Sequence, residues 1–192
     1  MTDQEIAQGI KNGDEEAFRE LVDTNQEMVI NVCNSFVHNK DDALDIAQEV
    51  FIKVYNSFDK FQGKSKISSW LYRIAVNKSL NFIRDKKRKN IFNSLDLIFE
   101  NSPNNSENLE DSSENSQEAI ENEETKTILQ QTINELPKKQ QTAIVLNKYE
   151  NLSYKEIAEV MNISLSETGV LINRAKKKLQ DKLIKKLKPN KK

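Results

Sequence analysis

Residues 90–124 divide the chain, because they carry ten acidic side chains and no basic one. They begin with a candidate docking stretch, whose apolar residues are Ile91, Phe92, Leu95, Leu97, Ile98 and Phe99, but only three aliphatic side chains follow, so residues 100–122 cannot contribute to a hydrophobic core. Burying so little apolar surface does not offset the conformational entropy that a chain loses on ordering. We therefore predict two folded domains, residues 1–89 and 125–192, joined by a flexible acidic linker at 90–124.

Both domains are predicted to be helical. The 192 residues include 4 glycines and 3 prolines, and no segment alternates apolar and polar side chains as a half-buried strand would. Residues 2–5 and 153–156 have the form of capping boxes, which open helices. Asp14 can cap a second helix, and Asp41 and Asp42 suit the positive end of a third. The fold class is therefore all-α.

Charge is arranged in blocks, although the net charge is only −1. Residues 60–89 carry a net charge of +9 and residues 126–192 another +9, whereas residues 1–59 carry −9. Binding to nucleic acid requires a local basic patch and not a basic chain. Two basic blocks on either side of an acidic segment predict two separate nucleic-acid contacts.

The first basic block contains a helix with a polar stripe. At 3.6 residues per turn, one face carries Trp70 at its start and then Arg73, Asn77, Asn81, Arg84 and Arg88. Cations bind phosphates, amides hydrogen-bond base edges, and aromatic rings stack on unpaired bases. This face is a candidate strand-reading surface, with a solvated helix that has a basic end as the alternative.

The second domain contains a helix-turn-helix pattern. Capping-box patterns at residues 153–156 and 164–167 stand eleven residues apart, which outlines two helices joined by a turn. In such a motif the second helix enters the major groove. Its outward positions, with the basic residues that follow, are Ser166, Gly169, Val170, Asn173, Arg174, Lys177 and Lys178. A purely structural helical hairpin is the alternative.

Metal sites, disulfides and catalysis are not expected. The single cysteine, Cys33, cannot form an internal disulfide, and with the single His38 it cannot form a zinc site of the usual type. Cys33 lies in an apolar segment and is predicted to be buried. The acidic residues of 41–49 are accompanied by no nucleophile, histidine cluster or phosphate-binding loop, which argues against a nucleic-acid enzyme. We expect no enzymatic activity, no metal and no cofactor.

A cytoplasmic protein is expected. The first residues are acidic where a signal peptide would be basic. No apolar run approaches the roughly 18 residues of a membrane span, so we expect no membrane segment.

Two parts of the chain resemble conserved regions of bacterial sigma factors. Residues 41–51 (DDALDIAQEVF), 61–64 (FQGK) and 70–77 (WLYRIAVN) resemble their second region. Residues 136–137 (LP), 152–158 (LSYKEIA) and 173–179 (NRAKKKL) resemble their fourth. With only a linker in between, the chain is similar to the small extracytoplasmic-function (ECF) group. The resemblance implies a factor that directs core RNA polymerase to specific promoters and aids promoter melting.

The resemblance also implies protein partners. Asp45, Gln48 and Glu49 match positions that dock on the β′ clamp of the polymerase, and the β flap is the second expected contact. Asp41, Asp45 and Glu49 follow at intervals of four residues, and such like charges repel on an isolated helix. A basic partner would relieve that cost; a solvated acidic face or, more weakly, a carboxylate metal site are the alternatives. An anti-sigma protein is a further partner that the family often implies.

For promoter DNA, the resemblance assigns one element to each domain. The loop at 61–69 would capture a base flipped from the melted minus-ten element, and Asn77 matches a position of the base pocket. The candidate minus-ten residues are Phe61, Gly63, Lys64, Ser65, Trp70, Arg73, Asn77, Asn81, Arg84 and Arg88. Lys66 and Ile67 stand where a small residue and an aromatic are usual, which leaves the base preference open.

The helix-turn-helix would bind the minus-thirty-five element through the outward residues named above. Val170 could contact a thymine methyl group, and Glu167 is expected to be a cap. The competing interpretation of the whole chain is a conventional helix-turn-helix regulator with an N-terminal sensor domain. Such a regulator would bind DNA as a tight dimer without polymerase.

Overall fold

The computed structural model describes residues 1–63, 65–99 and 117–187, and at 90–99, 117–124, 126 and 187 it describes the backbone alone. These residues form eight α-helices and one short 3-10 helix, and the described part of the chain contains no strand. The all-α prediction is confirmed. None of the described helices is both long and apolar enough to cross a membrane.

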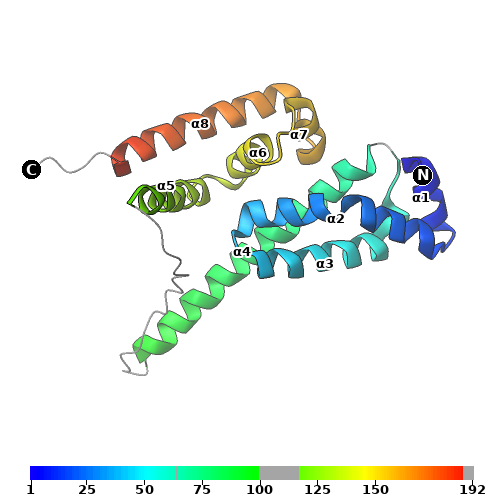
Figure 1. Cartoon of the computed structure of the whole chain (residues 1–192), viewed down its shortest axis with the longest axis horizontal. Helices are drawn as coiled ribbons and strands as arrows, with labels where there is room; N and C mark the ends of the chain where they lie inside the picture. Colours follow the sequence, from blue (N-terminus) through cyan, green and yellow to red (C-terminus); the bar gives the residue numbers. More distant parts are fainter. Residues whose placement is uncertain (64, 100–116, 188–192) are drawn as a thin grey trace, which may run out of the picture.

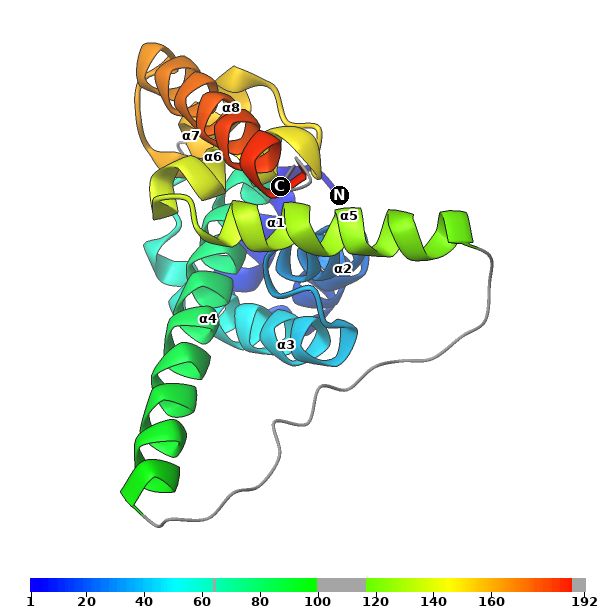
Figure 2. The ribbon, with the colours of Figure 1, turned by 90° about the vertical axis from the view of Figure 1, so that its left-hand side faces the viewer.

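The first domain consists of four helices. They are α1 (Asp3–Lys11), α2 (Glu15–Val37), α3 (Lys40–Ser57) and α4 (Ile67–Phe99), with the 3-10 helix η1 (Phe58–Lys60) following α3. Helices α2, α3 and α4 pack against one another, α1 packs on α2, and the end of α4 extends beyond the bundle (Figures 1 and 2). Fully buried side chains of this core include Leu21, Val29, Phe36, Val50, Val54 and Leu71. Cys33 is buried among them, as predicted, and burial raises the pKa of its thiol to about 11.

The second domain also consists of four helices. They are α5 (Gln117–Asn134), α6 (Lys138–Lys148), α7 (Tyr154–Met161) and α8 (Leu165–Leu187). Helix α8 packs against the other three. Helices α7 and α8 are joined by a turn in which Asn162 has a positive φ of 53°, and they form the predicted helix-turn-helix around Ile157, Ile172 and Ala175.

Most predicted helix starts are present. Thr2 and Ser153 each form a complete capping box with the glutamate three residues later, and the Asp14 carboxylate accepts the N–H groups of Glu16 and Ala17. The start of α3 also carries its predicted acidic residues. Asn39 is its cap, accepting from the Asp42 N–H at 2.9 Å, so Asp41 and Asp42 lie in the first turn.

The predicted linker is helical at both ends. Helix α4 continues to Phe99 and α5 begins at Gln117, so both helices enter the segment 90–124. Residues 100–116 lie outside the described residues. The domain boundaries at 89 and 125 therefore stay a prediction.

The two domains contact each other through four helices. Helix α7 packs on the first half of α4, and α6 approaches α2 (Figures 1 and 2). This arrangement, called the closed arrangement below, brings the helix-turn-helix onto the helix that carries the predicted strand-reading face.

Candidate nucleic-acid interface

The predicted polar stripe of α4, called the α4 surface, is divided by the closed arrangement. We define it by Trp70, Arg73, Asn77, Asn81, Arg84 and Arg88. Four of these side chains are exposed to solvent, namely Asn77, Asn81, Arg84 and Arg88. Arg84 is paired with its neighbour Asp85 at 3.0 Å, which holds the pKa of that carboxyl below its ordinary value. The second half of the surface thus presents cations and an amide to solvent.

The first half of the α4 surface rests on a cluster of aromatic rings. The ring of Trp70 is 5.5 Å from Phe58, at an interplanar angle of 86°, and 5.2 Å from Phe61, at 39°. Phe61, a candidate DNA contact from the sequence, is only 6% exposed. The structure therefore places Phe61 beneath Trp70 as support, and Trp70, which is half-buried, is the ring nearer to solvent.

The loop between η1 and α4 is held at both ends by α1. Lys11 donates from Nζ to the carbonyl of Phe61 at 3.0 Å, and the backbone N–H of Ile67 donates to the Asp3 carboxylate at 3.0 Å. Gly63 has a φ of +68°, in the left-handed region that favours glycine. Lys64 lies outside the described residues, and Ser65 is half-buried. These anchors could not be predicted from the sequence, because they join residues 50 and 64 positions apart.

Arg73 differs from the other cations of the α4 surface, because its side chain contacts the second domain. Its Nε donates to the carbonyl of Val160 at 3.0 Å, and its Nη2 donates to the carbonyl of Glu159 at 2.7 Å. Both carbonyls belong to the last turn of α7. Carbonyls in a last turn carry the negative end of the helix dipole, and the Glu159 carbonyl also accepts from the Asn162 N–H at 3.3 Å.

Three cavities lie along this contact, and two of them are lined by Arg73. One of about 720 Å³ is lined from the first domain by the loop residues 60–63, 65 and 66, by Trp70 and by Arg73, and from the second by Glu159 and Asn162. Another of about 370 Å³ has Arg73 and Asn77 on one side and α6 and α7 on the other. The residues expected to hold a flipped base thus face the helix-turn-helix in the closed arrangement.

A second contact between the domains is polar and half-buried. The Ser35 hydroxyl of α2 donates a hydrogen bond to the carboxylate of Glu150 at 2.7 Å. Glu150 lies two residues after the end of α6. Burial raises the pKa of the Glu150 carboxyl. Burial also raises the pKa of Tyr72 to about 12, with further contributions from Glu150 and Glu156.

The acidic surface of α3 is exposed and faces neither of these contacts. Asp45, Gln48 and Glu49 are all solvent-exposed, and Glu49 is paired with Lys78 of α4 at 2.6 Å. Three large apolar side chains, Leu44, Ile52 and Tyr55, are exposed on the same helix. We call this mixed patch the α3 surface. Sequence periodicity indicated its acidic part but not its apolar part.

The outward face of α8 is open. We define the α8 surface by Ser166, Gly169, Val170, Asn173, Arg174, Lys177 and Lys178, of which all but the half-buried Gly169 are exposed. The Ser164 hydroxyl accepts from the Glu167 N–H at 3.1 Å, but the Glu167 carboxylate pairs with Lys139 at 3.3 Å. A Cβ at Gly169 would lie 3.9 Å from the Tyr154 ring, an ordinary contact. Packing within the chain therefore does not require glycine at this position.

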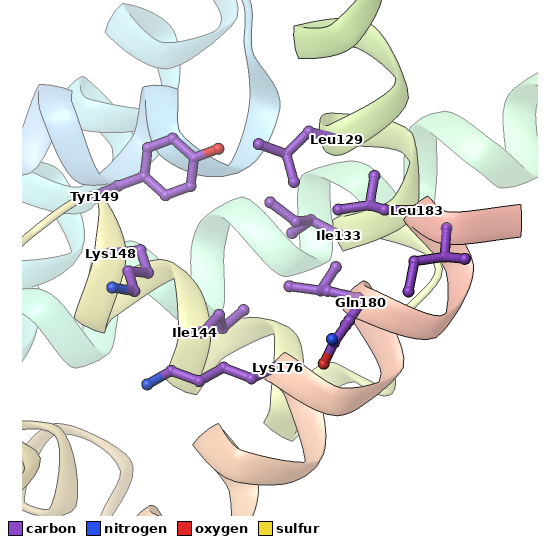
Figure 3. A pocket seen from close by; sticks show the side chains of 10 residues that line it. Leu129, Ile133, Ile144, Lys148, Tyr149, Lys176, Gln180 and Leu183 are labelled. Atoms are coloured by element: carbon purple, nitrogen blue, oxygen red, sulfur yellow. The ribbon is translucent and has the colours of Figure 1, made fainter. Parts of the chain in front are cut away.

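An apolar groove lies between α5, α6 and α8. Its volume is about 780 Å³, and its aliphatic lining comes from Leu129, Ile133, Ile144, Leu179, Leu183 and Ile184. Figure 3 labels Leu129, Ile133, Ile144 and Leu183 among them. Lys148 and Lys176 stand at its margin with Tyr149. Ile184 is 44% and Tyr149 42% exposed. This groove could not be predicted from the sequence, because its residues come from three helices.

Comparison with known proteins assigns both domains. The model for sigma-70 region 2 matches residues 21–89, and a model for sigma-70 region 4 matches residues 126–179. The ECF RNA polymerase sigma-E factor of Haemophilus influenzae is 34% identical over 184 residues, covering 95% of this chain and 96% of the relative. The ECF RNA polymerase sigma factor SigW of Bacillus subtilis is 34% identical over 174 residues, covering 91% and 92%.

Solved structures share the fold. The structure of CnrH in complex with the cytosolic domain of CnrY has a TM-score of 0.64 at 22% identity, covering 94% of this chain and 96% of that one. The sigma factor RpoE of Bartonella quintana, in complex with the anti-sigma factor NepR, has a TM-score of 0.57 at 20% identity, covering 90% and 98%.

Proposed function

The chain belongs to the ECF group of sigma-70 factors, and we propose that its α4 and α8 surfaces bind two different elements of one promoter. As a sigma factor, the chain directs core RNA polymerase to specific promoters in transcription initiation and has no catalytic activity of its own. We also propose that the chain acts in the cytoplasm, because its partners are core polymerase and promoter DNA.

The observation that carries the proposal is that the two surfaces differ in chemistry and lie in different domains. The α4 surface combines a half-buried tryptophan, amides and cations beside the loop that precedes α4. Such a surface can read a base only after the base has left the stack. We therefore assign the α4 surface, with Gly63, Lys64 and Ser65 of the adjoining loop, to the opened minus-ten element. Phe61 acts indirectly in this assignment, by supporting Trp70.

The α8 surface suits paired DNA. An exposed helix that follows a tight turn can enter the major groove, where Asn173 can hydrogen-bond base edges and Val170 can contact a thymine methyl group. Gly169 is free of contacts that would require it, which is consistent with close approach of the α8 backbone to DNA. Arg174, Lys177 and Lys178 would hold phosphates. We assign this surface to the minus-thirty-five element.

The α3 surface and the groove are proposed to bind polymerase. Asp45, Gln48 and Glu49 would contact the β′ clamp, with Ile52 and Tyr55 adding apolar area at the margin. The groove, lined mostly by aliphatic side chains, would hold an apolar segment of the β flap, since apolar faces of partner helices bind in such grooves. Copurification of the chain with core polymerase tests both assignments together; a chain that does not bind core polymerase would refute them.

The groove gives a specific prediction. The variant Ile184→Asn should weaken binding to core polymerase by about tenfold, because burial of an isoleucine side chain contributes about 1.5–3 kcal/mol. The adjacent variant Lys185→Asn is the matched control, since Lys185 is exposed and does not line the groove. Equal affinity of the two variants for core polymerase, measured by titration with a labelled chain, would show that the groove is not a polymerase contact.

A further inference from the structure

The loop at 61–67 is fixed at its two ends by a single helix, α1. Lys11 donates from Nζ to the Phe61 carbonyl at 3.0 Å, and the Asp3 carboxylate accepts the Ile67 N–H at 3.0 Å. Asp3 and Lys11 are the first and last residues of α1, which places them about 12 Å apart along the helix axis at 1.5 Å per residue. Helix α1 therefore sets the separation between the two ends of the loop.

The bond to Ile67 supplies a cap that the sequence around the start of α4 does not provide. Ile67 is the first residue of α4, and the first N–H groups of a helix have no partner within it. Lys66, which precedes the helix, has a side chain without an acceptor, and the first turn of α4 carries no acidic residue. The Asp3 carboxylate accepts the N–H of the buried Ile67 and interacts favourably with the positive end of the α4 dipole. Asp3 therefore caps α4 from another helix.

The bond to Phe61 fixes the ring on which Trp70 rests. The Phe61 N–H donates to the Phe58 carbonyl at 2.8 Å, so with the bond from Lys11 both backbone polar groups of Phe61 are paired. The Phe61 ring lies 5.2 Å from the Trp70 ring. Lys11 thus acts on the aromatic cluster of the α4 surface, although it lies on a different helix.

The position of α1 is itself determined by close packing. Helix α1 packs on both α2 and η1, and its Ile6 side chain is buried. A Cβ at Gly9 would lie 2.6 Å from the Cβ of the fully buried Ala17, so any larger residue at this position would force the helices apart. A helix of nine residues is marginal when isolated, so α1 depends on this packing. The bundle therefore fixes α1, and α1 fixes the loop.

We propose that α1 is a positioning element for the loop that reads the minus-ten element, and that Asp3 and Lys11 set how strictly the loop discriminates between bases without contacting DNA themselves. The proposal rests on the proposed function of the α4 surface and its loop. It extends that function to residues outside the segment 21–89 that matches sigma-70 region 2. Discrimination between bases depends on hydrogen bonds of defined length and angle, so a loop with one end released would admit other bases more readily.

A direct effect of charge on DNA predicts a different result. If Asp3 acted through its charge, removing it would strengthen binding to every sequence, because the phosphates are negative. If Lys11 acted in this way, removing its charge would weaken binding about equally for every sequence. A positioning role instead predicts that both changes reduce the difference in affinity between the preferred base and the other bases.

Binding of single-stranded DNA to the holoenzyme tests the proposal. The probes are fluorescein-labelled oligonucleotides that carry the minus-ten element of one promoter served by the chain, with each base of the element replaced in turn. Asp3→Ala and Lys11→Met should each lower the ratio of affinities for the preferred and the replaced base about fivefold, as expected for the loss of one hydrogen bond. Asp3→Asn keeps an acceptor and Lys11→Arg keeps a donor, so these variants should retain most of the ratio.

Two control variants lie outside the anchors. Gln4→Ala changes an exposed residue of α1, and Asp23→Ala removes an exposed carboxylate from α2; both should discriminate between bases as the unmodified chain does. Circular dichroism and titration with core polymerase check that each variant folds and forms holoenzyme. Anchor variants that discriminate as strictly as these controls would overturn the proposal. So would an Asp3→Ala holoenzyme that binds every oligonucleotide more tightly with an unchanged ratio.

A second measurement needs neither polymerase nor DNA. Trp70 is the only tryptophan of the chain, so its fluorescence reports on the aromatic cluster. In Lys11→Met it should be quenched by acrylamide more strongly than in Gln4→Ala, because Phe61 has lost one of its two backbone bonds. Equal quenching in the two variants would overturn the anchoring of Phe61.

The unmodified holoenzyme distinguishes failure of the inference from failure of the proposed function. If it binds all the oligonucleotides equally, the assignment of the α4 surface to the minus-ten element fails, and the positioning role fails with it. If it prefers one sequence and the anchor variants prefer that sequence as strongly, only the positioning role fails.

Discussion

Replacing both Asp45 and Glu49 by lysine is expected to weaken binding to core RNA polymerase by about a hundredfold. Like charges placed across an interface cost several kcal/mol, and a hundredfold loss corresponds to about 3 kcal/mol. Both side chains are exposed on α3, and the pair between Glu49 and Lys78 lies at the surface. Losing such a pair changes stability by about 1 kcal/mol or less. The variant should therefore keep its helical content and nearly all of its thermal stability.

A matched control keeps the charge change but moves it to another helix. Asp23 and Glu27 are exposed on α2 with the same spacing of four residues. Reversing both should leave the affinity for core polymerase within about twofold of the unmodified chain, because exposed charges far from an interface contribute little. If the α3 variant bound polymerase as tightly as this control, the assignment of the α3 surface would be wrong.

The second large effect is expected at Asn77. Asn77→Ala should reduce transcription from a closed promoter by about tenfold, since a bidentate contact to a base is worth about 1–3 kcal/mol. The defect should be partly rescued on a template whose minus-ten region is supplied pre-melted. The reason is that unpairing DNA costs about 1.4 kcal/mol per base step, which a captured base must offset only when the duplex is intact.

Asn173 is the counterpart on the α8 surface. Asn173→Ala should alter the preference at the minus-thirty-five element, because a helix in the major groove reads paired base edges. Pre-melting the minus-ten region should give no rescue of this variant. Equal rescue of both variants, or of neither, would contradict the assignment of the two surfaces to opened and paired DNA.

Local features of this chain were predictable from the sequence, because neighbouring residues determine them. The capping boxes at Thr2 and Ser153 depend on a glutamate three residues away, and both formed. The helix-turn-helix followed from two such signals and a short turn. The box expected at Ser164 formed only in part, because Lys139, 28 residues away, pairs with the Glu167 carboxylate.

Features that depend on distant contacts could not be predicted. Phe61 is an aromatic residue in the loop that was predicted to bind DNA, but Phe58 and Trp70 pack against it and bury it. Arg73 occupies a regular position on the basic stripe, yet its partners lie 86 and 87 residues later, in α7. The groove likewise needs three helices from the folded domain. Candidate residues for the site could therefore be named from the sequence, whereas their division into exposed, supporting and covered members could not.

Start-site mapping would show whether this chain gives core RNA polymerase its promoter specificity. Core polymerase with and without the chain would transcribe fragmented genomic DNA, and the 5′ ends of the transcripts would be sequenced. We predict start sites that appear only with the chain and share two short upstream motifs, at the minus-ten and minus-thirty-five positions, with a constant spacing. The account would be contradicted if the chain added no start sites and instead bound DNA tightly as a dimer without polymerase.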